Sequence, residues 1–133
     1  MYLLPKPKTI KEQDGQMLLC HSTHIVMTKE VAETEMHAAK RLQEAIRQET
    51  GLILPFSVGE VREGDLSLGI AKTLPEQTYE ITIDEKGGQI SGGDGAGVLY
   101  GVETFCQIVQ QCGGMPRICQ TVVIILTRQG DVC

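Results

Sequence analysis

The sequence predicts an α+β fold: a mixed, largely antiparallel sheet with two amphipathic helices packed on one of its faces. Residues 79–84 alternate apolar and polar side chains, which is the period of a strand buried on one face. Two longer segments, at about residues 30–51 and 95–112, repeat apolar residues at the spacing of a helix. Because short strand-like segments precede both, the two helices should pack together on a single sheet.

The N-terminal third should supply edge and hairpin strands. Prolines in residues 3–8 remove amide donors, so we expect this segment to lie along a sheet edge. Residues 9–11 and 16–20 flank Asp14-Gly15, a good turn sequence, and predict a hairpin. Residues 24–27 form a further short apolar run, which predicts another strand.

The first helical segment has a clear apolar stripe and a clear end. Gly51 is placed to end it, since glycine readily adopts the left-handed conformation of a helix C-terminus. Strands are expected at residues 53–58, interrupted by Pro55, and at residues 66–71, where apolar and small or polar residues alternate. The stripe comprises Met36, Ala39, Leu42, Ala45 and Ile46.

A second hairpin leads directly into the second helix. Residues 85–88 provide turn chemistry after the strand at 79–84, and residues 89–91 form the returning strand. Asp94 is expected to cap a helix that begins near Gly95. Gly113-Gly114 should end this helix. Its apolar stripe comprises Val98, Leu99, Val102, Phe105, Cys106 and Val109.

The glycines at the start of this helix admit two interpretations. Gly95, Gly97 and Gly101 between a strand and a helix have the outline of a dinucleotide-binding loop. However, the preceding strand returns from a hairpin, and no strand ending in an acidic residue follows at the distance typical of such sites. Close packing of helix on sheet, which glycine permits, is therefore the favoured interpretation over nucleotide binding.

Length and charge exclude several function classes. A chain of 133 residues predicts one domain and is far shorter than the ~250 residues of a TIM barrel. With only 12 basic residues and a net charge of −5, we expect no binding to nucleic acid or to an anionic membrane. Residues 1–8 do not resemble a signal peptide and no apolar run approaches ~18 residues, so a cytoplasmic location is expected.

The cysteines and histidines predict no reactive centre. The five cysteines are odd in number and lack a CxxC motif, so free thiols are expected, and Cys106 should be a small buried apolar residue. His21, His24 and His37 lack further ligands at metal-binding spacing. We therefore predict no catalytic, cofactor-binding or metal-binding residue in this chain. The cysteines are Cys20, Cys106, Cys112, Cys119 and Cys133.

One string carries a family resemblance. Residues 97–107 read GVLYGVETFCQ, with the pattern G-x-x-Y-G-x-x-T-x-x-Q. Leu4-Pro5-Lys6-Pro7, Thr50-Gly51, Leu68-Gly69 and Tyr79-Glu80-Ile81 agree with the same pattern. Together, over about residues 3–116, they resemble the N-terminal, non-catalytic domain of family-20 glycoside hydrolases, the β-N-acetylhexosaminidases. The similar domain of family-84 N-acetylglucosaminidases is a close second.

The resemblance implies a parent enzyme that removes terminal β-linked N-acetylhexosamine. In that family an Asp–Glu pair on a TIM barrel acts by substrate assistance, with the Glu as general acid and the acetamido oxygen of the substrate as nucleophile. The carboxylates Glu80, Asp84, Asp94 and Glu103 do not match the catalytic motif. The chain itself is thus expected to be inactive, and its partner in the parent to be that enzyme's own barrel. A stand-alone carbohydrate- or protein-binding module is the alternative.

The tail, residues 117–133, departs from the family pattern. The family continues with a leucine-proline step and a D-Y-P-like segment, whereas this chain continues with a β-branched run at residues 121–126. Codons that encode residues 118–127 permit the reading LPDCRDYPD in a shifted frame. We therefore predict a domain at residues 1–116 followed by a frame-shifted tail. A native strand is the alternative, and in either case the run can pair at a sheet edge, so a homodimer through the tail or a sheet edge is plausible.

Overall fold

A computed structural model describes residues 9–13, 17–20, 22–84, 86–111, 117–118 and 121–126. This part of the chain contains three helices, α1 (Lys29–Thr34), α2 (Met36–Thr50) and α3 (Gly95–Gln111). Its strands are β1 (Thr9–Gln13), β2 (Met17–Leu18), β3 (Ile25–Met27), β4 (Phe56–Val58), β5 (Leu66–Ile70), β6 (Tyr79–Asp84), β7 (Gly87–Gly92), β8 (Arg117–Ile118) and β9 (Thr121–Leu126).

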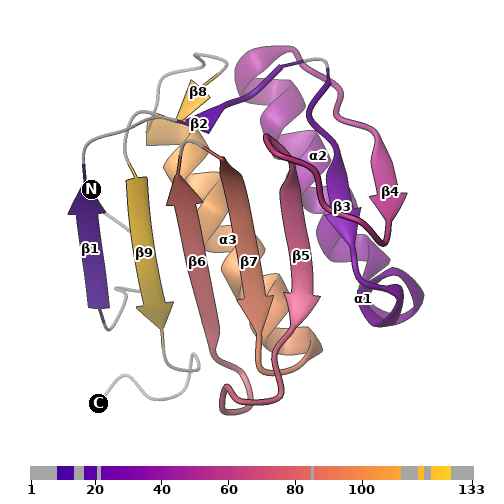
Figure 1. The fold of residues 1–133 in the computed structure, drawn as a ribbon, viewed down its shortest axis with the longest axis vertical. Coiled ribbons are helices and arrows are strands. Elements are labelled where there is room, and N and C mark those ends of the chain that lie inside the picture. Colours follow the sequence, from indigo (N-terminus) through magenta and orange to yellow (C-terminus); the bar gives the residue numbers. More distant parts are fainter. Residues whose placement is uncertain are drawn as a thin grey trace.

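The main sheet has seven strands in the order β1-β9-β6-β7-β5-β3-β4 (Figure 1). The pairs from β1 to β7 are antiparallel, and the pairs from β7 to β4 are parallel. The predicted mixed sheet is therefore confirmed, with its antiparallel and parallel pairs equally represented. Strands β2 and β8 form a small separate antiparallel pair.

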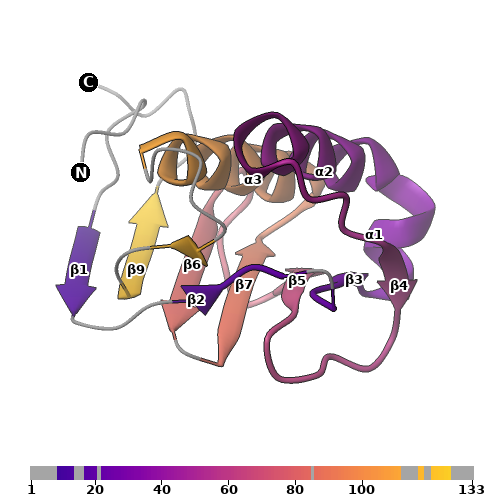
Figure 2. The ribbon, with the colours of Figure 1, turned by 90° about the horizontal axis from the view of Figure 1, so that it is seen from above.

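The helices form a single layer on one face of this sheet, as predicted (Figure 2). The core lies between the two layers and includes Leu42 and Ile46 of α2 and Val102 and Phe105 of α3, all fully buried. Both apolar stripes face the sheet, and none of the helices in the described part of the chain lies over its opposite face. Burial of these two stripes is the main source of stability.

The hairpin and α3 agree with the sequence pattern in detail. Tyr79, Ile81 and Ile83 are fully buried beneath α3, whereas the alternate residues Glu80 and Thr82 are partly exposed. Asp94 caps α3, because its Oδ1 accepts the Gly97 amide proton at 2.8 Å. The predicted end of the helix at Gly113-Gly114 lies outside the described residues.

The first helical segment is divided into two helices. Thr28 caps α1 through its side-chain oxygen, which accepts the Val31 amide proton at 3.3 Å. Glu35 separates α1 from α2 with φ −130° and ψ 32°, outside the helical range. The predicted cap at Gly51 is confirmed, since its φ of +81° is the left-handed conformation that favours glycine.

Glycines let α3 approach the hairpin closely. A Cβ at Gly101 would lie 2.6 Å from Ile90 Cγ2, and one at Gly97 would lie 2.1 Å from the Thr78 carbonyl oxygen. One turn beyond Gly101, the Thr104 hydroxyl forms a buried hydrogen bond with the Tyr79 hydroxyl. The glycines thus allow the short distance between α3 and the sheet. The hydrogen bond sets which part of α3 lies over Tyr79.

One strand prediction was wrong, and another was right only in part. The expected hairpin around Asp14-Gly15 is absent from the pairing, because β1 pairs with β9 and β2 with β8. The C-terminal run offers β1 a longer, β-branched partner than the local turn does. The predicted strand at residues 53–58 begins only at Phe56, because Pro55 has no amide proton to donate to the ladder.

The C-terminal run lies within the sheet. Strand β9 pairs with β6 on one side and β1 on the other, so one of the predicted possibilities, pairing within the same molecule, is what the structure has. The proline segment at residues 3–8 lies outside the described residues. In the described part of the chain, none of the helices has the length and apolar character needed to cross a membrane.

The buried Tyr79 predicts a loss of stability at alkaline pH. Burial raises the pKa of its phenol to about 12, against the opposing effect of the Thr104 hydroxyl. The ordinary value is 10.0, so as pH rises above 10 the unfolded chain loses this proton while the folded chain keeps it. The stability that the protonated Tyr79 contributes to the folded state is fully present below pH 10 and is lost between pH 10 and 12. Between pH 9 and 11, the free energy of unfolding should fall by about 1 kcal/mol more in the wild type than in Tyr79→Phe. Urea titrations at both pH values measure this difference, and equal losses in the two proteins would contradict it.

Candidate functional site

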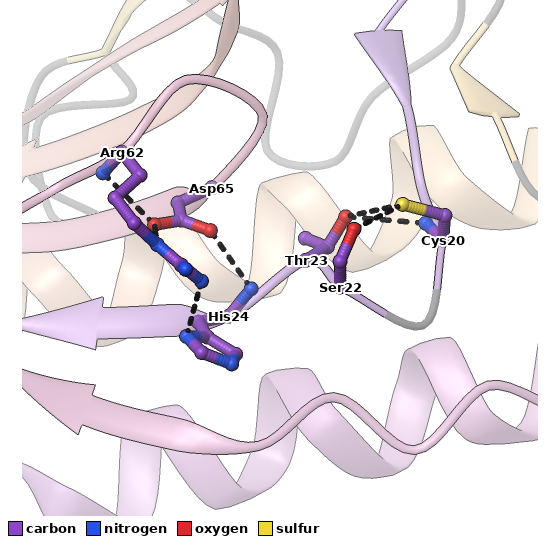
Figure 3. Close-up of polar contacts among 6 residues, drawn as sticks. All are labelled: Cys20, Ser22, Thr23, His24, Arg62 and Asp65. Carbon is purple, nitrogen blue, oxygen red and sulfur yellow. Dashed lines mark hydrogen bonds and ion pairs between the residues drawn. The ribbon is translucent and has the colours of Figure 1, made fainter.

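A polar cluster of described residues joins the segment before β5 to the start of β3 (Figure 3). Asp65 is 3% exposed, and its two oxygens accept the backbone amide protons of His24 at 3.0 Å and Arg62 at 2.9 Å. Arg62 Nε lies 3.6 Å from Asp65 Oδ2, and Arg62 Nη2 lies 2.8 Å from His24 Nδ1. Because each of its oxygens accepts a backbone amide proton, this carboxylate holds the two segments together.

A second polar group surrounds Cys20, in the turn before β3 (Figure 3). Its Sγ lies 3.0 Å from Ser22 Oγ and 3.7 Å from Thr23 Oγ1, and hydrogen bonds from these residues lower the pKa of the thiol. Thr23 Oγ1 also accepts the Cys20 amide proton at 3.1 Å. Among the described residues, the side chains that contact the Cys20 thiol are the hydroxyls of Ser22 and Thr23.

Cys106 has the inert environment expected from its place on the apolar stripe of α3. Its side chain is 1% exposed, and burial raises the pKa of the thiol to about 12. A thiol with that pKa stays protonated at neutral pH and is a poor nucleophile. Cys20 and Cys106 are both free thiols, as predicted, and the other three cysteines lie outside the described residues.

The two described histidines lie in separate parts of the fold. His24 contacts Arg62 at the start of β3, whereas His37 on α2 is exposed and places Nε2 3.2 Å from Glu35 Oε2. His21 lies outside the described residues. In the part of the chain that is described, no group of three or more His, Cys, Asp or Glu side chains is arranged to hold a metal ion.

The glycine-rich start of α3 is filled by the chain itself. Asp94 Oδ1 accepts amide protons from Gly97 at 2.8 Å and Gln77 at 3.0 Å, so a carboxylate already occupies the N-terminus of the helix. A Cβ at Gly92 would lie 2.3 Å from the Val98 nitrogen, which shows how closely the turn packs on the helix. A bound phosphate would meet the charge of Asp94. These contacts favour the packing interpretation over nucleotide binding.

The remaining carboxylates are dispersed. Glu103 on α3 pairs with Arg41 on α2. Arg41 Nε donates to Glu103 Oε1 at 3.1 Å, and Arg41 Nη2 donates to Glu103 Oε2 at 3.5 Å. Glu80 alternates with the buried side chains of β6 and so lies on the face without helices. Asp94 caps α3, and the side chain of Asp84 is not among those described. No two of these described carboxylates converge in the way that acid–base hydrolysis requires.

Described residues line two shallow depressions on the helix-free face. One, of about 160 Å³, lies between the segment before β5 and the β6–β7 hairpin, and a neighbouring one measures about 140 Å³. Both are smaller than the ~300–1,000 Å³ usual for small-molecule sites. Val61, Ser67 and Gln89 line both, with no aromatic side chain in either lining. The depressions can hold water but lack the surface on which a sugar ring stacks.

Sequence reasoning missed the role of Asp65. The residue precedes an alternating strand and looks like an ordinary polar loop residue. Its partner His24 lies 41 positions away, and local pattern carries no signal for such a contact. By contrast, Asp94 was predicted as a cap because its partner Gly97 lies three residues on.

Comparisons with known proteins give one consistent result. The family model described as "Glycosyl hydrolase family 20, domain 2" matches residues 1–124. A β-hexosaminidase of Porphyromonas gingivalis is 28% identical over 110 residues, which is 80% of this chain and 14% of that protein. A β-hexosaminidase of Vibrio furnissii is 28% identical over 111 residues, which is 84% of this chain and 17% of that protein. The chain thus spans only about a seventh of the Porphyromonas protein.

Solved structures agree at the level of the fold. The family-20 exo-β-N-acetylglucosaminidase of Vibrio harveyi, in complex with N-acetylglucosamine, matches with a TM-score of 0.74 and 19% identity, over 94% of this chain and 19% of that one. The family-20 β-N-acetylhexosaminidase of Streptomyces coelicolor matches with a TM-score of 0.70 and 20% identity, over 95% and 26%. Because the family model covers nearly all of the sequence, the chain belongs to glycosyl hydrolase family 20, of which it is the non-catalytic domain 2.

Proposed function

We propose that this chain is part of a β-N-acetylhexosaminidase whose catalytic barrel lies outside the given sequence. Its role is to pack against that barrel and support it. The observation that carries the proposal is the match of residues 1–124 to a non-catalytic domain of a hydrolase family. Two relatives named β-hexosaminidase are about six to seven times longer than the part that matches, which leaves ample length for a barrel.

The polar contacts support a structural role. Asp65 joins two loops, Arg41 and Glu103 join two helices, and Asp94 joins a loop to a helix. Every buried side-chain nitrogen or oxygen among the described residues has a hydrogen-bond partner. A catalytic centre usually keeps some polar groups available for its substrate. The described part of this domain uses its buried polar groups internally instead.

We also propose the domain boundary at residue 116 and a frame-shifted tail, although the family match extends to residue 124 and strand β9 of the tail lies within the sheet. If a frame change near residues 114–117 replaced the native continuation, the source DNA beyond the codon of Cys112 should stay open in a shifted frame. That frame should encode a region of barrel size with an adjacent Asp–Glu pair. Sequencing several hundred bases past the stop codon tests this. Stop codons throughout the shifted frames would show that residues 117–133 are the native end.

The isolated chain should not hydrolyse a hexosaminide. With 4-nitrophenyl N-acetyl-β-glucosaminide as substrate, nitrophenol release should equal that of buffer, because the described residues provide no pair of convergent carboxylates. A full-length family-20 enzyme serves as the positive control. Turnover that co-elutes with the pure chain and scales with its concentration would contradict the proposal. Saturable binding of N-acetylglucosamine in calorimetry, without turnover, would instead favour the alternative of a stand-alone binding module.

Asp65 should matter for stability. Asp65→Asn places an amide group where two backbone amide protons now meet carboxylate oxygens, so one donor loses its acceptor in a buried site. We expect the free energy of unfolding to fall by about 1–3 kcal/mol. Glu80→Gln is the matched control, because it makes the same change on a partly exposed strand residue and should cost under about 0.5 kcal/mol. Urea unfolding at pH 7 compares the two, and equal stability of both variants would exclude the anchoring role of Asp65.

A further inference from the structure

The two long helices differ in the sides that they turn away from the sheet. Both belong to the one helix layer and bury an apolar stripe in the core (Figure 2). Helix α2, of 15 residues, also carries the exposed charged side chains Lys40, Glu44 and Arg47. In helix α3, of 17 residues, the only charged side chain is Glu103. The outer side of α2 is therefore suited to water, whereas that of α3 is not strongly so.

The side chains of α3 that are partly or fully exposed form one stripe along the helix. They recur at steps of one, three and four residues, which places them on a single side. Apolar side chains occupy the first half of the stripe, and amide side chains follow in the second half. Its one carboxylate, Glu103, is paired with Arg41 of α2 at 3.1 Å, so the stripe presents no unpaired charge. This α3 outer face comprises Ala96, Leu99, Tyr100, Glu103, Gln107 and Gln110.

The opposite face of the sheet is more polar. Glu80 and Thr82 of β6 and Gln89 and Ser91 of β7 are partly or fully exposed there. Removing water from such side chains costs free energy unless a partner replaces each hydrogen bond. Among the broad surfaces formed by described residues, the α3 outer face is thus the one that another protein surface can cover at least cost.

Other exposed apolar side chains of the described residues do not share one element. Ile53, Val58 and Val61 are divided between two loops and the three-residue strand β4. A large rigid partner needs a continuous surface, and a helix of 17 residues supplies one. The α3 outer face is therefore the better candidate for a contact between domains.

We propose that the α3 outer face is the surface on which the catalytic barrel of the parent enzyme packs. This inference rests on the proposed function, which supplies the barrel. The matched part is 14% and 17% of the two curated relatives, so in both a much larger remainder is joined to this domain. The outer ring of a TIM barrel consists of helices, and a stripe on one helix packs into the grooves of another.

The path of the chain supports the same occupant. Helix α3 ends at Gln111, and the proposed frame change lies only a few residues further on, near residues 114–117. The native continuation toward the barrel would then leave the domain beside the C-terminal end of α3. A barrel joined at that point lies within reach of α3 without a long linker.

Nitration of Tyr100 tests this proposal. Tetranitromethane modifies a tyrosine ring only where reagent reaches it, and Tyr100 is partly exposed in this chain. The comparison is between the 133-residue chain and the full-length protein expressed from the source DNA in the continued frame. Mass spectrometry of the peptide that contains Tyr100 should show about tenfold slower nitration in the full-length protein, since a contact worth ~1.4 kcal/mol already protects tenfold.

Two residues provide internal controls for this comparison. Tyr79 is fully buried and should stay unmodified in both proteins, which establishes that each is folded. Lys40 lies on the exposed side of α2, so acetic anhydride should acetylate it at the same rate in both. Equal nitration of Tyr100 would overturn the inference and leave the proposed function standing. Protection of Lys40 in place of Tyr100 would also overturn it and would put the barrel over α2.

A charge on the α3 outer face should weaken the contact. Tyr100→Lys should lower the urea midpoint of this domain more in the full-length protein than in the 133-residue chain. Gln48→Lys is the matched control, because it adds the same charge to an exposed position of α2 and should affect both proteins alike. Equal effects of Tyr100→Lys on the two proteins would contradict the inference. If no reading frame continues into a barrel, the proposed function itself fails and this inference with it, so the two failures are distinct.

Discussion

The close approach of α3 to the β6–β7 hairpin is the contact on which the rest of the domain depends. It is possible only because Gly97 and Gly101 have no side chain where the helix meets Thr78 and Ile90. The Tyr79–Thr104 hydrogen bond then sets the position of the helix along the hairpin. With α3 in place, α2 packs beside it, and both apolar stripes are covered by one sheet. In this chain, the string at residues 97–107 that carries the family resemblance is thus a packing motif: Gly97, Gly101 and Thr104 place the helix on the hairpin.

The polar side chains of the domain extend this packing across the chain. Asp65 ties β5 to β3, and Arg41–Glu103 bridges the helices on their partly exposed side. The exposed helix pair is worth little in free energy because water screens it, whereas the buried carboxylate has backbone partners that would otherwise be unsatisfied. Stability therefore rests on Asp65 far more than on the ion pair. Because the buried polar side chains of the described residues all have partners within the domain, its outer surfaces are what remains to contact other molecules.

Local pattern predicted those elements whose partners lie nearby in sequence. The alternation in β6, the stripes of α2 and α3, and the caps at Asp94 and Gly51 all depend on residues within a few positions of one another. Pairing of β1 with β9 joins residues more than a hundred positions apart, and the contact of Asp65 with His24 spans 41. Such contacts are decided by competition among all available strands and loops, so a good turn sequence at Asp14-Gly15 did not determine the partner of β1. The break at Pro55 was visible in the sequence, and only its extent was misjudged.

Strand β9 lies inside the sheet, a position that requires an extended backbone able to pair on both sides. Among the described residues, β1 is joined to the main sheet only through β9, and β9 pairs on both sides. A run of six residues rich in Val and Ile suits that position because β-branched residues favour an extended backbone. Pairing depends on backbone groups and strand propensity, whatever the origin of the sequence. A tail produced by a change of reading frame would therefore fill the place between β1 and β6 as readily as a native strand, so the ordered sheet and a replaced family junction are compatible features of one chain.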